Sequence, residues 1–211
     1  VGLMASDKGG KGFDPLPEAV YDAVCFWIID LGHHLDEKFG TGKRQHKILI
    51  GWETPAERIT IEKDGVKQDL PRMISKKYTL SLNEKANLRK ELQTWRGRVF
   101  TETELEGFDI KNVLGKSCMI QVIHNKKGDK VYANIAAIMP LMKGTVPLVP
   151  ENPLVFYSIE DHRDQIPAGV PDWVRDIIKT SDEWQAFKPA EEVHPAVVDD
   201  VPNNDNEDVP F

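Results

Sequence analysis

The sequence predicts a mainly β protein with a five-stranded barrel at its centre and helical additions around it. Runs rich in β-branched and aromatic residues follow the order strand, strand, strand, helix, strand, strand across residues 17–143. Turn signals at Asp64-Gly65 and at residues 125–129 join two pairs of these strands into hairpins. An oligonucleotide/oligosaccharide-binding (OB) barrel requires this order, with its helix between the third and fourth strands.

The first strand is expected at residues 18–31, where the apolar run ends at Gly32. Residues 32–43 then read as a polar loop. His33, His34 and Asp36 within it suggest a metal site, but no further ligand lies at a suitable spacing, so a solvated loop is the preferred interpretation.

The second and third core strands are expected at residues 48–53 and 73–80, with Pro55 ending the second. Between them, residues 58–62 and 66–70 flank the Asp-Gly turn. This pattern predicts a β-ribbon inserted between two strands of the barrel.

A helix is expected after the third strand, from an N-cap at Asn83 to Trp95, with Gly97 as its stop. Its apolar stripe has helical spacing and comprises Leu88, Leu92 and Trp95. A second helical segment has the spacing of a capping box, with Thr101 and Glu104, and turns Leu105 and Phe108 inward.

The fourth and fifth strands are expected at residues 116–124 and 130–139. The following residues, 144–189, are proline-rich and then helical, with Pro171 in the first turn of a short helix. The chain is thus divided into a flexible arm (1–16), an OB domain (17–143), an extension packed on the barrel (144–189) and a disordered acidic tail (190–211).

Charge is unevenly distributed along the chain. The formal net charge of −7 belongs to the tail, which holds seven acids and neither lysine nor arginine. Residues 43–150 hold 20 lysines and arginines against 12 acids, a balance of +8. A basic centre between acidic ends suits a surface that meets a polyanion, although the same charge spread over both faces would be ordinary solvated surface.

Several classes of protein lack support in the sequence. Cys25 and Cys118 lie in apolar runs and read as buried hydrophobic residues of a reducing compartment. Neither a signal peptide nor an apolar run of membrane-spanning length occurs, so a cytoplasmic location and no membrane partner are expected. No phosphate loop, dinucleotide fingerprint, metalloprotease motif or nucleophile elbow is present, so no catalytic residue, metal or other cofactor is expected.

The end of the chain carries a family resemblance. Its last residues, Asp208-Val209-Pro210-Phe211 with Asp205 and Glu207 before them, resemble the acidic tail tip of bacterial and phage single-stranded DNA-binding proteins. The resemblance covers about a tenth of the chain and implies recruitment of replication and recombination proteins by this tip. The alternative is a solubilising tail that ends in an aromatic residue.

The resemblance and the barrel together predict a phage or bacterial protein that binds single-stranded DNA without sequence preference. Cations along the DNA backbone and aromatic faces under the bases would hold the strand. The expected DNA-binding residues are Lys43, Arg44, Lys47, Trp52, Lys76, Tyr78, Lys126, Lys127, Lys130 and Tyr132. Trp52 and Tyr78 also share strand faces with apolar residues, which leaves a core position as their alternative.

Two other functions stay open at this stage. The first is a replisome or recombination adaptor whose barrel binds protein and does not bind DNA. The second is an enzyme on an OB-like barrel, which only the fold class favours. The inserted ribbon, the second helical segment and the extension depart from the ordinary bacterial family and argue against its tetramer, with a homodimer as the alternative.

Overall fold

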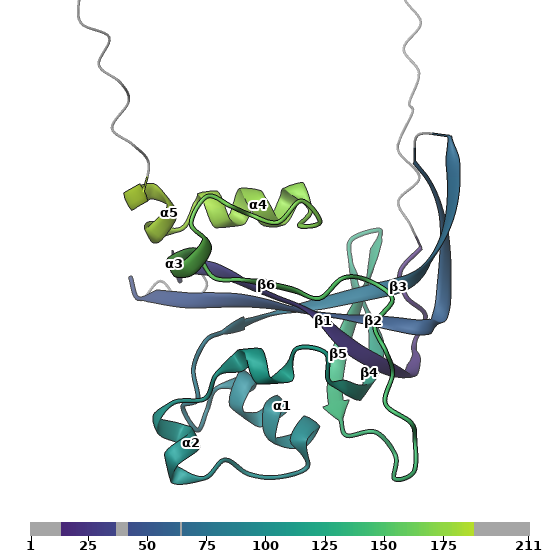
Figure 1. Ribbon diagram of the computed structural model, residues 1–211, viewed down its shortest axis with the longest axis horizontal. Coiled ribbons are helices and arrows are strands. Elements are labelled where there is room, and N and C mark those ends of the chain that lie inside the picture. The colour runs from purple at the N-terminus through teal and green to yellow at the C-terminus, as the bar shows by residue number, and fades with distance from the viewer. Residues whose placement is uncertain (1–13, 37–41, 64, 188–211) are drawn as a thin grey trace, which may run out of the picture.

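The computed structural model describes residues 14–36, 42–63 and 65–187. Five antiparallel strands form a curled sheet, a half-barrel, in the order β3-β2-β1-β4-β5 (Figure 1). Their bounds are β1 Ala19–Leu35, β2 Arg44–Lys63, β3 Val66–Thr79, β4 Ser117–Lys127 and β5 Lys130–Met139. The expected mainly β, barrel-like architecture is confirmed. The acidic tail and most of the predicted N-terminal arm lie outside the described residues.

Strand β1 does not end at Gly32, as the sequence suggested. It continues to Leu35, and the register with β2 shifts between Asp30 and Gly32. Gly32 has a φ of 78°, a left-handed conformation that glycine adopts without a Cβ clash, so the strand bends there and goes on. His33 and His34 are therefore strand residues that pair with β2, and the loop expected from residue 32 is wrong at its start.

The predicted ribbon is present, but it is not an insertion. Strand β2 runs through Pro55 to Lys63, and β3 pairs with it from Val66 to Thr79. A register shift between Thr54 and Arg58 absorbs the proline, because a bulge leaves residues outside the ladder. The ribbon is thus the outer half of one long hairpin.

Helix α1 spans Asn87–Arg96, so it begins later than predicted. Asn83 accepts hydrogen bonds from the N–H groups of Lys85 (3.1 Å) and Ala86 (2.8 Å), which makes a turn before the helix. The asparagine signal therefore marked a turn, where its side chain competes with the helix for backbone donors.

The predicted inner face of the first helix, its stop at Gly97 and the capping box of the second helix are confirmed. Leu88, Leu92 and Trp95 of α1 are buried, and Gly97 caps the helix with a φ of 66°. Helix α2 (Glu102–Glu106) begins with the predicted capping box of Thr101 and Glu104, and a 3-10 turn, η2 (Ile110–Val113), follows it.

One core lies between the concave face of the sheet and α1. Apolar residues of all five long strands meet the buried face of α1 there, and the rings of Trp52 and Trp95 lie 5.8 Å apart between centroids. Cys25 and Cys118 are buried in this core as free thiols, as expected, and burial raises the pKa of both. Leu16, just before β1, is buried here too.

A second core covers the opposite face of β1. Strand β6 (Val155–Tyr157) pairs in parallel with β1, and α3 (Ile159–His162), α4 (Asp172–Lys179) and α5 (Asp182–Phe187) follow. Figure 1 shows these helices on one side of the sheet and α1 with α2 on the other. Val174 and Ile178 of α4 are fully buried, so β1 has apolar neighbours on both faces. Among the described residues, no helix is long and apolar enough to span a bilayer.

Candidate nucleic-acid interface

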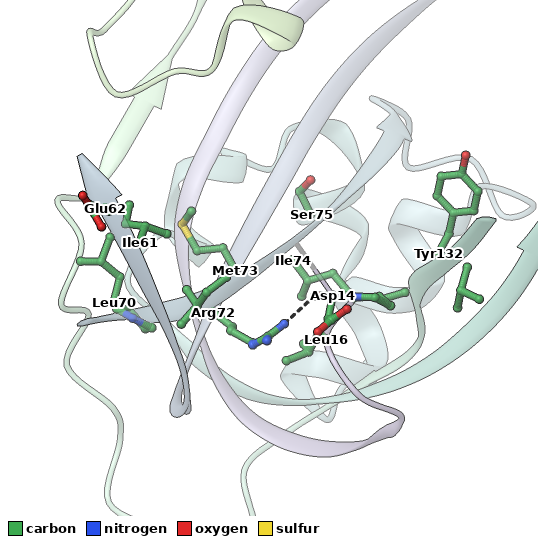
Figure 2. A pocket seen from close by; sticks show the side chains of 15 residues that line it. Asp14, Leu16, Ile61, Glu62, Leu70, Arg72, Met73, Ile74, Ser75 and Tyr132 are labelled. Carbon is green, nitrogen blue, oxygen red and sulfur yellow. Dashed lines mark hydrogen bonds between the residues drawn. The ribbon is translucent and has the colours of Figure 1, made fainter. Parts of the chain in front are cut away.

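A groove of about 740 Å³ lies between the β2–β3 ribbon and the β4–β5 hairpin. Figure 2 shows Ile61, Leu70 and Met73 on the ribbon side and Tyr132 on the hairpin side. The lining comprises Asp14, Pro15, Leu16, Ile59, Ile61, Glu62, Leu70, Pro71, Arg72, Met73, Ile74, Ser75, Val131, Tyr132 and Ala133. We call it the groove.

Strand periodicity makes the ribbon wall apolar. Ile59 and Ile61 are two residues apart on β2 and so lie on one face, and Leu70 of β3 pairs directly with Ile59. Met73 and Tyr132 are 52% and 48% exposed, which is high for large side chains of this type. The groove therefore offers open apolar and aromatic surface next to polar edges.

The charge inside the groove is mixed. Arg72 donates to the carbonyl oxygens of Asp14 (2.7 Å) and Arg58 (3.4 Å), and among the described residues no carboxylate pairs with it. Arg58 instead pairs with Asp69 (2.9 Å) and Glu151 (2.6 Å). The charge of Arg72 thus remains available to an anion in the groove.

The hairpin beside the groove is strongly basic. Lys126, Lys127 and Lys130 are exposed around its tip, and Lys127 lies directly opposite Lys130 in the β4–β5 ladder. Like charges directly opposite each other destabilise a hairpin, and a bound anion removes this repulsion. Four expected DNA-binding residues therefore lie on one hairpin: Tyr132 lines the groove, and the three lysines are exposed around the hairpin tip.

Two expected aromatic contacts are corrected by burial. Trp52 is 0% exposed and packs against Trp95 in the first core, and Tyr78 is 4% exposed. Neither ring presents a face on which a base can stack. Both residues lie on the concave side of the sheet, under α1, so their core alternative is the one that the structure realises.

Lys76 belongs to the same interior region as Tyr78. Its ammonium donates to Glu91 of α1 (2.7 Å) and to the carbonyl of Ile135 on β5 (3.0 Å), while the Tyr78 hydroxyl donates to Glu91 (2.5 Å). Burial and the Glu91 charge raise the pKa of Tyr78, so the phenol stays protonated. This triad joins β3, α1 and β5, and Lys76 is not part of the groove.

The three cations expected before the second strand lie at the other end of β2, far along the strand from the ribbon tip. Arg44 pairs with Asp182 of α5, and Lys43 is exposed next to it in sequence. Lys47 donates to Gln45 and to Thr79 (2.8 Å), and burial lowers its pKa. None of the three lines the groove.

Sequence reasoning missed most of the ribbon wall. Arg72 and Met73 lie at the start of the predicted third strand and were not singled out. The alternating Ile59-Thr60-Ile61, with Leu70 across the turn, could have indicated this wall. Two apolar residues on one face of a ribbon outside the barrel need another surface to contact.

The tail residues expected to bind partners, Asp205 and 207–211, lie outside the described residues. Within the described part of the chain, no group of three or more histidine, cysteine, aspartate or glutamate side chains is arranged to hold a metal ion. Comparison of the chain with protein-family models, curated proteins and solved structures finds no match. The inference on function therefore depends on the groove and its surroundings.

Proposed function

We propose that the chain binds single-stranded DNA in the groove between the β2–β3 ribbon and the β4–β5 hairpin. The observation that carries the proposal is half-exposed Tyr132 in the lining of an apolar groove, on the same hairpin as three exposed lysines. Bases would stack on the ring and contact the apolar wall, and the lysines would contact backbone phosphates.

The sheet order supports a finer proposal, that the half-barrel is an OB fold. Strand β1 pairs with both β2 and β4, and β3 and β5 form the two ends of the path. One side-chain hydrogen bond, from the Lys76 ammonium of β3 to the Ile135 carbonyl of β5, links those two ends. The proposed role of the tail tip, recruitment of replication and recombination proteins, depends on the resemblance alone.

The test is fluorescence anisotropy with labelled oligo-dT of about 30 nucleotides, across a salt series. We expect tight binding that weakens as salt rises, and much weaker binding of a duplex of equal length. Absence of binding at low salt, repeated without residues 190–211 to remove the acidic tail, would contradict the proposal.

A second candidate is an adaptor that holds a protein segment in the same groove. The apolar lining favours it, because Ile59, Leu70 and Met73 offer more surface to apolar side chains than to phosphates. This candidate predicts oligonucleotide binding that is absent or insensitive to salt. The same anisotropy series therefore separates the two functions.

A further inference from the structure

A second cavity, of about 460 Å³, lies where the end of α1, helix α2, η2 and the start of β4 meet, and it shares no lining residue with the groove. Its lining comprises Arg96, Arg98, Glu104, Phe108, Asn112, Val113 and Lys116. We call it the α2 pocket. Three cations and one acid line it, so its formal balance is +2.

Arg96 is held rigidly in this pocket. Its guanidinium lies 4.5 Å from the ring centroid of Phe100 and 4.9 Å from that of Phe108, and Nη2 donates to Glu104. Its Nη1 is buried and has no hydrogen-bond partner among the described residues. A buried charged donor without an acceptor is costly, so an acceptor from a ligand would stabilise it.

Glu104 does not neutralise the pocket fully, because its acceptor positions are already used. Arg98 donates to both of its oxygens (2.9 and 2.7 Å), Arg96 donates to Oε1 and the Thr101 N–H donates to Oε2 (3.0 Å). The hydrogen bonds from Arg98 and then from the Thr101 backbone lower the pKa of Glu104 to about 2. This carboxylate therefore stays ionised and orients the two arginines.

The remaining donors are free. Within the described part of the chain, neither the Lys116 ammonium nor the Asn112 amide has a partner, and both residues are exposed. Together with the guanidinium of Arg96, which borders the pocket, they give it two positive charges and an amide N–H for one anion. Guanidinium and ammonium groups around one site are the usual donors to phosphate.

We propose that the α2 pocket binds a phosphate group of the single-stranded nucleic acid that occupies the groove. This inference rests on the proposed function. Lys116 immediately precedes β4, and Lys126 and Lys127 end it, so this strand connects the two basic regions. The cavity is larger than one phosphate needs, which leaves room for part of the attached nucleotide.

The test uses the full chain and a variant, Lys116→Gln with Asn112→Ala, which changes only exposed side chains. Lys179→Gln, on α4 across the sheet, is the matched control. Binding of oligo-dT of about 30 nucleotides should weaken about threefold to tenfold in the pocket variant, with a salt dependence shallower by about 0.7 for the phosphate lost. Oligo-dT of roughly 8 nucleotides, filling the groove alone, should bind all three proteins equally.

The outcomes separate this proposal from the proposed function. Equal binding of the long oligonucleotide by the unaltered protein and the pocket variant, both with and without a 5′-phosphate, would overturn the pocket and leave the groove standing. No binding by the unaltered protein would overturn both. If the loss appears only with an oligonucleotide that carries a 5′-phosphate, the pocket holds a strand end, and if it appears without one, the pocket holds the backbone.

Discussion

Tyr132 and Tyr78 show how the position of one residue decides its role. Both lie on strands beside lysines and both were expected to bind DNA, although only Tyr78 had a core position as its alternative. Tyr78 is buried under α1 and bonded to Glu91, whereas Tyr132 stands at the edge of the groove with about half of its surface exposed. An aromatic ring binds bases only where one face is open, so exposure and residue type together select Tyr132.

Replacing Tyr132 with alanine should therefore weaken binding of single-stranded DNA without unfolding the protein. A base stack of this kind is worth roughly 1–3 kcal/mol, which corresponds to a loss of about fivefold or more in affinity. Trp173→Ala, another half-exposed aromatic but on α4, is the control in anisotropy measurements and should bind as the unaltered protein does. Equal losses in both variants would remove Tyr132 from the interface.

Glu53 is a charged residue with a structural role in the interior of the protein. It is fully buried, and its carboxylate accepts hydrogen bonds from the backbone N–H groups of Glu151 (2.6 Å) and Asn152 (3.1 Å) and from the Asn152 amide (2.6 Å). It thereby fixes the segment before β6 to β2.

Glu53→Gln should lower the free energy of unfolding by roughly 1–3 kcal/mol, because an amide N–H would replace an acceptor that faces buried donors. Urea unfolding measures this change. Glu57→Gln, a nearby acid on the same strand without such bonds, should differ from the unaltered protein by less than about 0.5 kcal/mol. An unchanged free energy of unfolding in Glu53→Gln would mean that other contacts hold the segment before β6.

At the scale of elements, α5 is attached to β1 by a close contact at a glycine. A Cβ on Gly32 would lie 2.5 Å from the Ser181 Cβ and 2.7 Å from Glu183 Oε2, and the φ of 78° is itself unfavourable for other residues. The bend in β1 and the start of α5 thus depend on each other.

Gly32→Ala should destabilise the protein by roughly 2–4 kcal/mol, through left-handed strain and through collision with α5. Gly42→Ala is the matched control, because Gly42 also has a positive φ, 63°, but no atom within 4 Å of an added Cβ. Thermal or urea unfolding should show the smaller loss for Gly42→Ala. Equal losses would show that backbone strain alone matters and that α5 yields without cost.

Two histidine–carboxylate pairs stabilise the junction, the region around Gly32 where β1 meets β2 and α5. His46 Nε2 lies 2.7 Å from Asp30 Oδ1, and His33 contacts Glu183 through its ring and its N–H. The hydrogen bond to Asp30 raises the pKa of His46, while burial opposes that shift. Burial would raise the pKa of Glu183, but the hydrogen bonds from His33 outweigh it and lower the pKa to about 2.

These pKa shifts make the stabilisation of the junction depend on pH. Protonated His46 stabilises the fold fully below its ordinary pKa of about 6.5, and this contribution is lost as pH rises through the folded-state value. Ionised Glu183 stabilises it fully above about 4.5, and this contribution is lost as pH falls toward 2. Both contributions are complete between these two pH values.

His46→Gln should therefore reduce the free energy of unfolding more at about pH 5.5 than at about pH 8.5, by less than about 1 kcal/mol. Glutamine keeps a neutral donor near Asp30, so only the charge is removed. Urea unfolding of both proteins at the two pH values gives the comparison. If the difference in free energy of unfolding between the two proteins does not change with pH, His46 acts only as a neutral donor.

At the scale of the whole molecule, charge separates the chain into opposing parts. Removal of residues 190–211 takes away seven acids, neither lysine nor arginine, and leaves 27 acids against 27 lysines and arginines. A tethered acidic segment competes with DNA for basic surface at a high effective concentration.

Deletion of residues 190–211 should thus raise the affinity for single-stranded DNA at low salt, and the gain should shrink as salt screens the charges. A chain of full length with the seven tail acids changed to amides is the control, and it should behave like the deletion. Unchanged affinity of the deletion variant at low salt would show that the tail does not compete with DNA.

Much of the barrel-like fold was predictable because its signals are local. The β4–β5 hairpin, the capping box at Thr101, the apolar face of α1 and the Gly97 stop each depend on residues close together in the chain. Errors arose where distant parts decide the outcome. The sequence indicates a strand end at Gly32, yet pairing with β2 and contacts with α5 hold the chain extended beyond it.

The sequence by itself determined the mainly β class, the hairpins, the buried thiols and the separation of an acidic tail from a basic centre, because periodicity, turn residues and charge are properties of neighbouring residues. Only the tertiary structure decided which aromatic residues are exposed and which cations share a surface. Trp52 and Tyr78 lie in the core, because the curled sheet and α1 cover that face. Tyr132 lines the groove, and Lys126, Lys127 and Lys130 are exposed around the tip of the same hairpin, which α1 does not cover.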